Sequence, residues 1–426
     1  MIIVGARCTG SPLATLLARR GLKVCAIDRA TLPSDTPSTH GIQPAGVEAL
    51  GRLGVLGRLT ALAPPIESAF IALNDHRAEV ADMPALLGAP MLSVRRITLD
   101  ALLCDHAREA GADVRTGTML TGLLTDGGRV VGVKTTAGDL RARLVVGADG
   151  ARSSLARLVG AEEYHRTPAR RAFLWSYFEA VDDHRDRLWL GSLGGDNFFA
   201  CPTDGGLLLI AFVAPMDRRD ELRADRESAF EEGIRRWPEL AAALAGTRRA
   251  APVQLMTNWH GFFRRSAGPG WVLVGDAGHF KDPTPGQGIA DALRQVERLA
   301  PAIEQSLRSS VPDDEPLHAW WRWRDKDAWD MYWFAADMGR SDSWSQISAA
   351  ADHRMAADPA LLDRFLRVLN HDLPASRFIT PATGLSILRD AMRENKGSRR
   401  TVLKETRFLA RQELGRLRER RRGPKP

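Results

Sequence analysis

Three short turns, each rich in glycine and carrying an acidic residue, constrain this 426-residue chain more than any other feature. They begin at Gly5, Gly147 and Gly275, and each directly follows a short run of apolar residues. A glycine turn after a parallel strand lets the backbone bend tightly into a helix whose N-terminus attracts phosphate. The sequence therefore predicts an α/β fold with a nucleotide site at one edge of a mostly parallel sheet.

The first turn, residues 5–10, joins an apolar strand at residues 1–4 to a helical pattern at 11–20. A second apolar strand, residues 24–27, ends at Asp28. A dinucleotide fingerprint needs glycines close to the pyrophosphate and an acid about 20 residues later for the ribose hydroxyls. Gly5, Gly10 and Asp28 meet these needs. Arg7 replaces the middle glycine, where it would either pair with a phosphate or crowd the pyrophosphate.

The other two turns place an acid where a predicted buried strand ends. Asp149 lies in the second turn, Gly-Ala-Asp-Gly-Ala-Arg, and Asp276 in the third, Gly-Asp-Ala-Gly-His. The third turn runs on through residues 283–289 into another helical pattern, whose first N–H groups would face an anion. One such turn is weak evidence for a ligand, but three in this order predict a single shared site.

Between the turns, the pattern predicts helices at residues 46–59 and 99–110. Apolar runs at 114–124, 130–136 and 140–146, separated by Asp-Gly-Gly and Gly-Asp, predict an antiparallel meander. More strands follow within 173–213, then a polar helix at about 220–236 and a strand at 271–274. Beyond residue 289 the pattern is mostly helical. Five tryptophans between residues 320 and 333 spread around one predicted helix, which favours core or inter-domain packing over an aromatic substrate wall.

The three motifs together resemble those of the flavoprotein monooxygenase family that includes p-hydroxybenzoate hydroxylase, over roughly the first three quarters of the chain. The resemblance implies a Rossmann-like FAD-binding domain with an inserted β-rich substrate domain and a helical C-terminal region. We expect the FAD-binding domain at residues 1–72, 91–165 and 268–310. The substrate domain would take residues 73–90 and 166–267, and the helical region residues 311–426.

By the same resemblance, the first turn would bind the ADP half of FAD, Asp276 the ribityl chain, and the segment after it the flavin ring. The second turn is linked in the family to FAD and to transient NAD(P)H binding. The expected cofactor-binding residues are Gly5, Arg7, Gly10, Asp28, Arg29, Arg96, Asp149, Gly150, Gly275, Asp276, Pro283, Gly286, Gln287, Gly288 and Ile289. No catalytic residue is assigned, and no metal site is expected.

The chain also departs from the family's pattern. Ser38-Thr39-His40 stands where many members carry an arginine, Pro285 replaces a frequent glycine, and Ala290 replaces a frequent asparagine. A histidine near a flavin, such as His40 or His279, would steer proton transfer or merely pack. We expect Lys281 and Asp282 to pair on the surface, and Cys8 to act as a small hydrophobe.

The resemblance implies an NAD(P)H- and O2-dependent monooxygenase. It would hydroxylate or epoxidise a small, aromatic or polyketide-like molecule through a flavin hydroperoxide. The main alternative is an FAD-dependent reductase or dehydrogenase of an unsaturated, isoprenoid-like substrate. A non-catalytic flavin-binding sensor is a third hypothesis. A halogenase is disfavoured because Trp321-Arg322-Trp323 lacks the Ile-Pro continuation of that family's Trp-x-Trp-x-Ile-Pro signature.

Composition adds a location and excludes some partners. The formal net charge of +7 is concentrated near residues 418–425, which we interpret as a solvated helix end and not as a nucleic-acid site. The four cysteines lack metal-like spacing, and no apolar run is long enough to span a bilayer or to form a signal peptide. These features predict a cytoplasmic protein.

Overall fold

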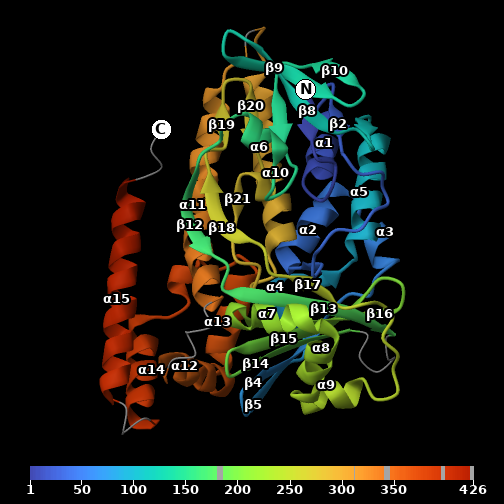
Figure 1. Cartoon of the computed structure of the whole chain (residues 1–426). Coiled ribbons are helices and arrows are strands. Elements are labelled where there is room, and N and C mark those ends of the chain that lie inside the picture. The colour runs from blue at the N-terminus through green and yellow to red at the C-terminus, as the bar shows by residue number, and fades with distance from the viewer. Residues whose placement is uncertain (180–185, 311, 340–345, 395–398, 423–426) are drawn as a thin grey trace.

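The computed structural model describes residues 1–179, 186–310, 312–339, 346–394 and 399–422. Figure 1 shows a parallel sheet with its helices in the upper half, a second sheet below it, and the C-terminal helices along one side. The predicted α/β architecture with a β-rich part and a helical C-terminal region is confirmed.

The upper half is built on a six-stranded sheet with the order β19-β20-β11-β1-β2-β7. Its strands are Ala267–Gly268, Trp271–Leu273, Val145–Gly147, Ile2–Val4, Cys25–Ile27 and Asp113–Arg115, in that order. All but the edge strand β19 run parallel. Val4 pairs with Gly147, and Gly147 with Leu273. This register brings the carboxyl ends of β1, β11 and β20 to the same edge.

Helices cover one face of this sheet and a small antiparallel sheet covers the other. The helices are α1 (Gly10–Ala18), α5 (Arg96–Glu109), α10 (Gly288–Ser306) and α11 (Glu315–Met338). The small sheet contains β8 (Leu120–Asp126), β9 (Arg129–Thr135) and β10 (Gly138–Arg141), and the short α6 (Ser154–Leu158) packs beside it. The predicted meander was therefore wrong at both ends, because β7 and β11 join the parallel sheet instead.

Two predicted helices are each divided by a local signal. The first becomes α2 (Pro44–Leu53) and α3 (Leu56–Thr60), because Gly54 adopts a left-handed φ of 87° and ends α2. The polar helix becomes α7 (Arg219–Ala224) and α8 (Arg226–Arg235), where the Asp225 carboxylate accepts the N–H of Ser228 at 3.0 Å.

The lower half is a seven-stranded sheet with the order β17-β13-β16-β15-β14-β4-β5. Its strands are Gln254–Met256, Arg171–Glu179, Leu207–Pro215, Asp196–Thr203, Arg187–Leu193, Ser68–Leu73 and His76–Val80, in that order. One face packs on α7, α8 and α9 (Pro238–Ala243), and the other on α4 (Met83–Leu87), α12 (Gln346–Ala357) and α13 (Pro359–Leu369). The predicted domain boundary between residues 72 and 73 was misplaced, because it cuts through β4.

A third sheet, β12-β18-β21, links the two halves. Its strands are Glu163–Pro168, His260–Arg264 and His279–Phe280. The rings of Trp329 and Tyr332 on α11 pack against Phe263 of this sheet, while Trp320 and Trp321 are buried against the parallel-sheet core. Packing, as expected, explains these tryptophans.

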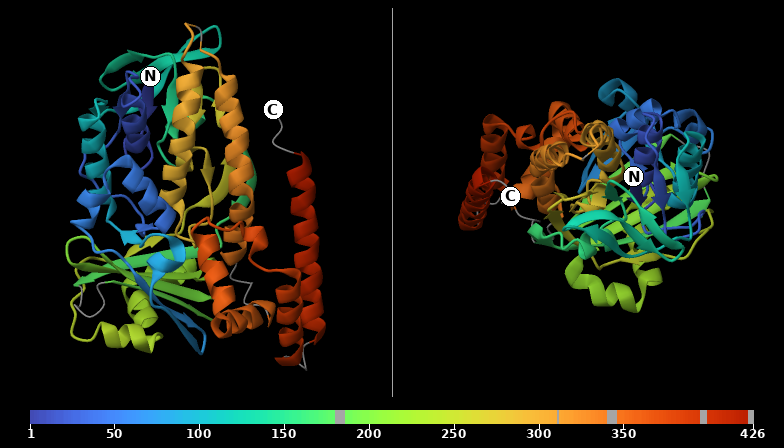
Figure 2. Two further views of the ribbon diagram at one scale, coloured as in Figure 1. Left: turned by 180° about the vertical axis from the view of Figure 1, so that it is seen from behind. Right: turned by 90° about the horizontal axis from the view of Figure 1, so that it is seen from above.

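The short strands β3 (Gly41–Ile42) and β6 (Leu92–Ser93) pair with each other. At the C-terminal end, α12 and α13 are followed by α14 (Pro381–Glu394) and α15 (Arg399–Arg422). In the views of Figure 2, α15 is the outermost of these helices. Among the described residues, no helix combines the length and the apolar character needed to cross a bilayer.

Replacing Trp320 with alanine should lower the free energy of unfolding by about 3–5 kcal/mol, because the ring fills the core between α11 and the parallel sheet. Trp323 is a matched control on the same helix, since it is only partly buried. Urea titrations of both variants test this, and an equal loss for the two would contradict the assigned core position of Trp320.

Candidate functional site

The three glycine turns meet at the carboxyl edge of the parallel sheet. Gly5 has a φ of +97°, and a Cβ there would strike the carbonyl oxygen of Ala148 in the second turn. A Cβ on Gly275 in the third turn would lie 2.8 Å from the Thr9 hydroxyl in the first. Glycine at these two positions lets the first turn contact the second and the third, so the predicted convergence of the turns is observed.

Asp28 holds the first turn against the second strand. Its buried carboxylate accepts the N–H of Ala6 at 3.0 Å and that of Ala30 at 2.9 Å. The Arg7 guanidinium is bound by Asp100 at 3.1 Å and by the Ser34 hydroxyl at 2.7 Å. The Arg7 side chain therefore links the first turn to Asp100 and to the segment around Ser34.

Asp100 is a buried junction beneath the first turn. It accepts the N–H of Cys8 at 3.0 Å and the Nε–H of Arg96 at 3.0 Å, in addition to Arg7. Arg96 is the first residue of α5, so the helix carries both partners. Burial raises the pKa of the Cys8 thiol to about 11, which agrees with Cys8 acting as a small hydrophobe.

Asp276 differs from Asp100 in having no partner. Its carboxylate makes no hydrogen bond or ion pair with any described residue, although the positive charge of Arg96 acts on it. Burial raises the pKa of Asp276 to about 6, and Arg96 opposes that shift. An acid placed at the junction of three turns without a protein donor fits a ligand that donates hydroxyl groups.

The side chain of Asp149 binds the start of the helix that follows the second turn. One carboxylate oxygen accepts the Ser153 hydroxyl at 2.5 Å and the other the N–H of Ser154 at 2.7 Å, so Asp149 caps the short helix α6. Gly150 follows with a left-handed φ of 78°. These contacts leave the backbone of this turn, and not the carboxylate, for a ligand.

The segment from residue 283 to 289 forms a tight entry to α10. Gly286 has a φ of +65°, the carbonyl of Pro285 accepts the Gln43 amide at 3.2 Å, and no side chain caps α10. Gln287 donates its amide to the carbonyl of Leu369 at 2.7 Å. Its side chain therefore anchors the end of α13, and only the backbone of this segment remains available to an anion.

The remaining expected site residues separate into two groups. Gly10 and Ile289 lie in the core beside the turns, and Pro283 and Gly288 are at least partly accessible. Arg29 is exposed and makes no ion pair with any residue that the structure describes. Ala290, one of the departures, is explained by packing: a Cβ on Gly46 would lie 2.9 Å from that of Ala290, so α2 and α10 leave no room for asparagine.

Lys281 and Asp282 do not form the expected surface pair. Both are buried, and Lys281 donates to Asp291 on α10, whose other oxygen lies 2.8 Å from His371 Nε2. Asp282 instead accepts the hydroxyl of Thr284 at 2.6 Å. This buried Lys281–Asp291–His371 cluster ties the segment after α13 to the start of α10.

The two histidines considered for proton transfer have separate roles. His279 is buried against Phe263 and Tyr332, and burial holds its pKa well below the ordinary value. It is a packed, neutral side chain. His40, in a left-handed conformation with φ 55°, is hydrogen-bonded to the Tyr177 hydroxyl on β13. Its buried Nδ1 has no protein partner.

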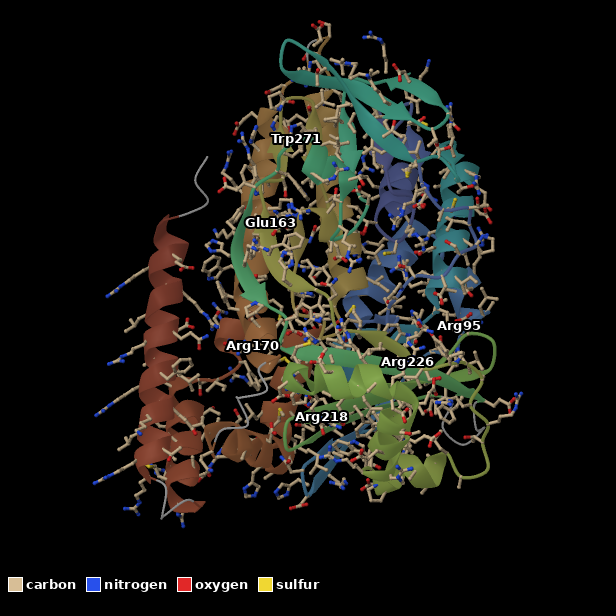
Figure 3. All side chains as sticks on the ribbon, in the orientation of Figure 1. Arg95, Glu163, Arg170, Arg218, Arg226 and Trp271 are labelled. Atoms are coloured by element: carbon tan, nitrogen blue, oxygen red, sulfur yellow. The ribbon has the colours of Figure 1, made fainter. Side chains whose placement is uncertain are left out.

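A cleft of about 760 Å³ opens beside the second turn. Arg152 from that turn and Arg223 and Arg226 from α7 and α8 line it, above Leu255 and Met256. None of the three arginines forms an ion pair within the part of the chain that the structure describes. Figure 3 places Arg226 at the level where the upper half meets the seven-stranded sheet.

Comparison with known proteins identifies the family. The model of the FAD binding domain family matches residues 1–330 of this chain. The chain belongs to this family. The resemblance to aromatic-hydroxylase-type flavoproteins is confirmed, and the predicted cofactor, FAD, is confirmed with it.

The curated relatives include oxygenases and reductases. Rifampicin monooxygenase of Streptomyces venezuelae is 27% identical over 71% of this chain, and the aligned part spans 64% of that protein. Menaquinone reductase of Mycobacterium tuberculosis is 28% identical over 72% of this chain and 76% of its own length. 6-Methylpretetramide 4-monooxygenase of Streptomyces rimosus is 26% identical over 72% and 75%.

Solved structures share the fold at lower identity. The flavin-dependent brominase Bmp2 superposes with a TM-score of 0.75 at 20% identity, covering 92% of this chain and 98% of that one. A probable FAD-dependent monooxygenase from Pseudomonas aeruginosa, pqsL, gives 0.66 at 19% identity, covering 88% and 98%. At these identities the likeness shows the fold alone.

Several residues of the site escaped sequence reasoning. Asp100 and Gln295 lie inside amphipathic helices, where nothing local distinguishes them from surface residues, yet Gln295 accepts the Gly275 N–H at 3.0 Å. Thr9 lies within the first motif, but the sequence did not predict its contact with Gly275.

Replacing Asp276 with asparagine should weaken FAD binding about tenfold, through loss of a charge-assisted hydrogen bond. Burial raises the folded pKa to about 6 from 3.8, so the ionised carboxylate destabilises the apoprotein above pH 6. The variant's apoprotein should therefore melt higher than wild type near pH 8, and the gain should vanish towards pH 4.

Asp149→Asn is the matched control, because Asp149 caps α6. This variant should lose about 1–2 kcal/mol of stability and keep its FAD affinity once folded. Flavin-fluorescence titration and thermal melts of the two apoproteins measure both quantities. Equal FAD affinity of Asp276→Asn and wild type would contradict the role of Asp276.

Proposed function

We propose that this chain is an FAD-dependent monooxygenase that uses NAD(P)H and O2 to hydroxylate or epoxidise a small aromatic or polyketide-like molecule. The observation that carries the proposal is the unpartnered Asp276 at the meeting point of three glycine turns. Relatives named as rifampicin and 6-methylpretetramide monooxygenases support this type of reaction. Four free cysteines favour a reducing, cytoplasmic location.

The residues at the sheet edge fit FAD. In our proposal the pyrophosphate lies against the backbone of Gly5–Gly10 at the start of α1, and Arg29 and the Asp28 segment border the adenosine half. Asp276 accepts ribityl hydroxyls, with Arg96, Gly150 and Gly275 around it. The backbone at Pro283, Gly286, Gln287, Gly288 and Ile289 presents the positive end of α10 to the flavin ring.

Bound FAD supplies the electron transfer from NAD(P)H and the activation of O2. The protein's task is to keep the site dry and to orient the substrate. Two contacts hold α13 and the residue after it across the entry to α10: Gln287 binds the carbonyl of Leu369, and Asn370 accepts the N–H of Ala45 at 2.7 Å. We infer that the end of α13 excludes water from the ring.

The substrate would lie near His40 and Tyr177, where the flavin half meets the seven-stranded sheet. Tyr177 lies on the face of β13 that also carries Trp175 and Phe173, which are buried in the core against α12 and α13. Burial lowers the pKa of His40 to about 3 and raises that of Tyr177, so both stay neutral at pH 7. The free Nδ1 of His40 would bind a polar group of the substrate.

We place NAD(P)H in the cleft beside the second turn. Arg152, Arg223 and Arg226 are three cations without carboxylate partners, and the acids of the same cleft are occupied. Asp225 caps α8, and Glu227 binds the Val253 N–H at 3.1 Å. Such a surface fits the phosphates of a dinucleotide that docks only transiently.

A reductase is the second candidate function. The menaquinone reductase relatives align over a larger share of their own length than the rifampicin monooxygenase does. The halogenase alternative is weakened by Trp321 and Trp323, which lie in α11, where Trp321 belongs to the core.

The two candidates separate under labelled oxygen. The purified yellow protein, given NAD(P)H and a library of aromatic and polyketide-like molecules, should incorporate one atom of 18O2 per product molecule. Anaerobic conditions should abolish product. A product that forms without oxygen and has gained two hydrogen atoms would identify a reductase instead of a monooxygenase. Bound FAD with no oxidation of NAD(P)H in the presence of any substrate would favour a sensor.

Replacing Arg226 with alanine should raise the KM for NAD(P)H about tenfold and leave kcat nearly unchanged, since the contact would be the same in ground and transition states. Arg235 is the matched control, because it is an exposed arginine on the opposite side of α8 from Arg226. Steady-state kinetics with varied NAD(P)H measure the effect. A similar KM for both variants would move the dinucleotide out of this cleft.

A further inference from the structure

The last helix, α15, is fastened to the molecule along one face only. Arg416 is buried there, binds Asp337 of α11 at 2.6 and 2.7 Å, and lies over the Trp333 ring at 4.7 Å. Val402 packs into a small cluster with α12 and α14. The inner face of α15 therefore has a fixed orientation relative to the body.

A side of α15 next to the fastened face carries an exposed apolar stripe. Leu403, Leu414 and Leu417 are 44%, 56% and 44% exposed. With Ala410 they fall on one side of a helix that has 3.6 residues per turn. Isolated exposed leucines need no explanation, but several in one line on one helix form a continuous surface. We call these four residues the leucine stripe.

A row of basic side chains runs beside the leucine stripe. It comprises Arg400, Lys404, Arg407, Arg411 and Arg418, all of them exposed. None forms an ion pair with a described residue. Figure 3 shows side chains with nitrogen tips projecting from α15 away from the rest of the molecule. We call these five residues the basic row.

The acidic side chains of α15 contact other protein groups and not the basic row. Glu419 lies 3.4 Å from His165, Glu413 lies 3.7 Å from Arg416, and Glu405 accepts the Ile347 N–H. Negative charge therefore accompanies the fastened face, while the free face is apolar and positive. A solvated helix end has no need for this separation.

We propose that α15 lies on the surface of an anionic lipid bilayer. The leucine stripe enters the interface and the basic row binds lipid phosphates. Because Arg416 fixes the helix to α11, docking would hold the whole enzyme at one orientation to the membrane. This inference is independent of the reaction proposed above.

The pattern fits lipid better than it fits a second copy of the chain. In a coiled coil with Leu403, Ala410 and Leu417 at one core position, the other would hold Arg400 and Arg407 before Leu414. The seam would then hold unpaired, like charges. A nucleic acid would use the basic row but would gain nothing from the leucine stripe, so the leucines distinguish the two anionic partners.

Sedimentation of the FAD-loaded, full-length protein with vesicles tests the proposal. The protein should pellet with vesicles of phosphatidylglycerol mixed with phosphatidylcholine and stay in solution with phosphatidylcholine alone. Raising the salt from about 0.1 M to about 0.5 M should release most of it. Arg407→Ala and Arg411→Ala should each weaken vesicle binding about fivefold.

Substituting serine at Leu403, Leu414 and Leu417 together should abolish vesicle binding while FAD content and melting temperature stay at wild-type values. Leu62→Ser, which changes a leucine 48% exposed elsewhere, and Arg235→Ala are the matched controls and should bind like wild type. Equal binding to both vesicle types, or full binding by the triple variant, would overturn the proposal. If light scattering shows a dimer for the wild-type protein and a monomer for the triple variant, the leucine stripe would be assigned to contact with a second copy of the chain. If the protein does not bind vesicles, and the triple variant still binds duplex DNA, the basic row would be assigned to nucleic acid.

Discussion

The site depends on the absence of side chains at a few positions along one sheet edge. Parallel pairing of β1, β11 and β20 aligns their carboxyl ends, and this puts three turns within contact of each other. Gly5 against Ala148 and Gly275 against Thr9 leave no space for a Cβ. Any larger residue would separate the turns, and the ligand-facing groups would no longer point to one place. The acids can therefore face a common site only because the turns pack this closely.

Sequence reasoning succeeded where the signal is local. A glycine that needs a positive φ after a buried strand is visible in the sequence, so the three turns and the α/β fold followed from it. It failed where the partner is distant. The pairing of Arg7 with Asp100 could not be foreseen, because Asp100 is far along the chain. The buried pairing of Lys281 with Asp291, in place of its neighbour Asp282, has the same origin: polar sequence next to a motif does not reveal its burial.

The C-terminal region also has a role that its composition did not indicate. His371 reaches Asp291, Gln287 holds the carbonyl of Leu369, and Asn370 meets Ala45. Each contact ends on the segment that enters α10 or on α2 beside it. The helical region is therefore joined to the flavin-binding turns by polar contacts between buried or half-buried groups, while α12 and α13 cover the aromatic face of the second sheet. One set of helices thus closes both sides of the place where cofactor and substrate would meet.

Two carboxylates near Arg96 show how a structural acid is separated from a ligand-facing one. Asp100 is completely buried, yet it receives two arginines and a backbone N–H, so its charge is balanced within the protein. Asp276 is less enclosed but has no donor, and burial works against its charge with Arg96 as the main opposing cation. A protein gains nothing from burying an acid that it leaves unsatisfied, unless another molecule supplies the donors. The contrast between these two neighbours is the observation on which the proposed place of the flavin's hydroxyl groups rests.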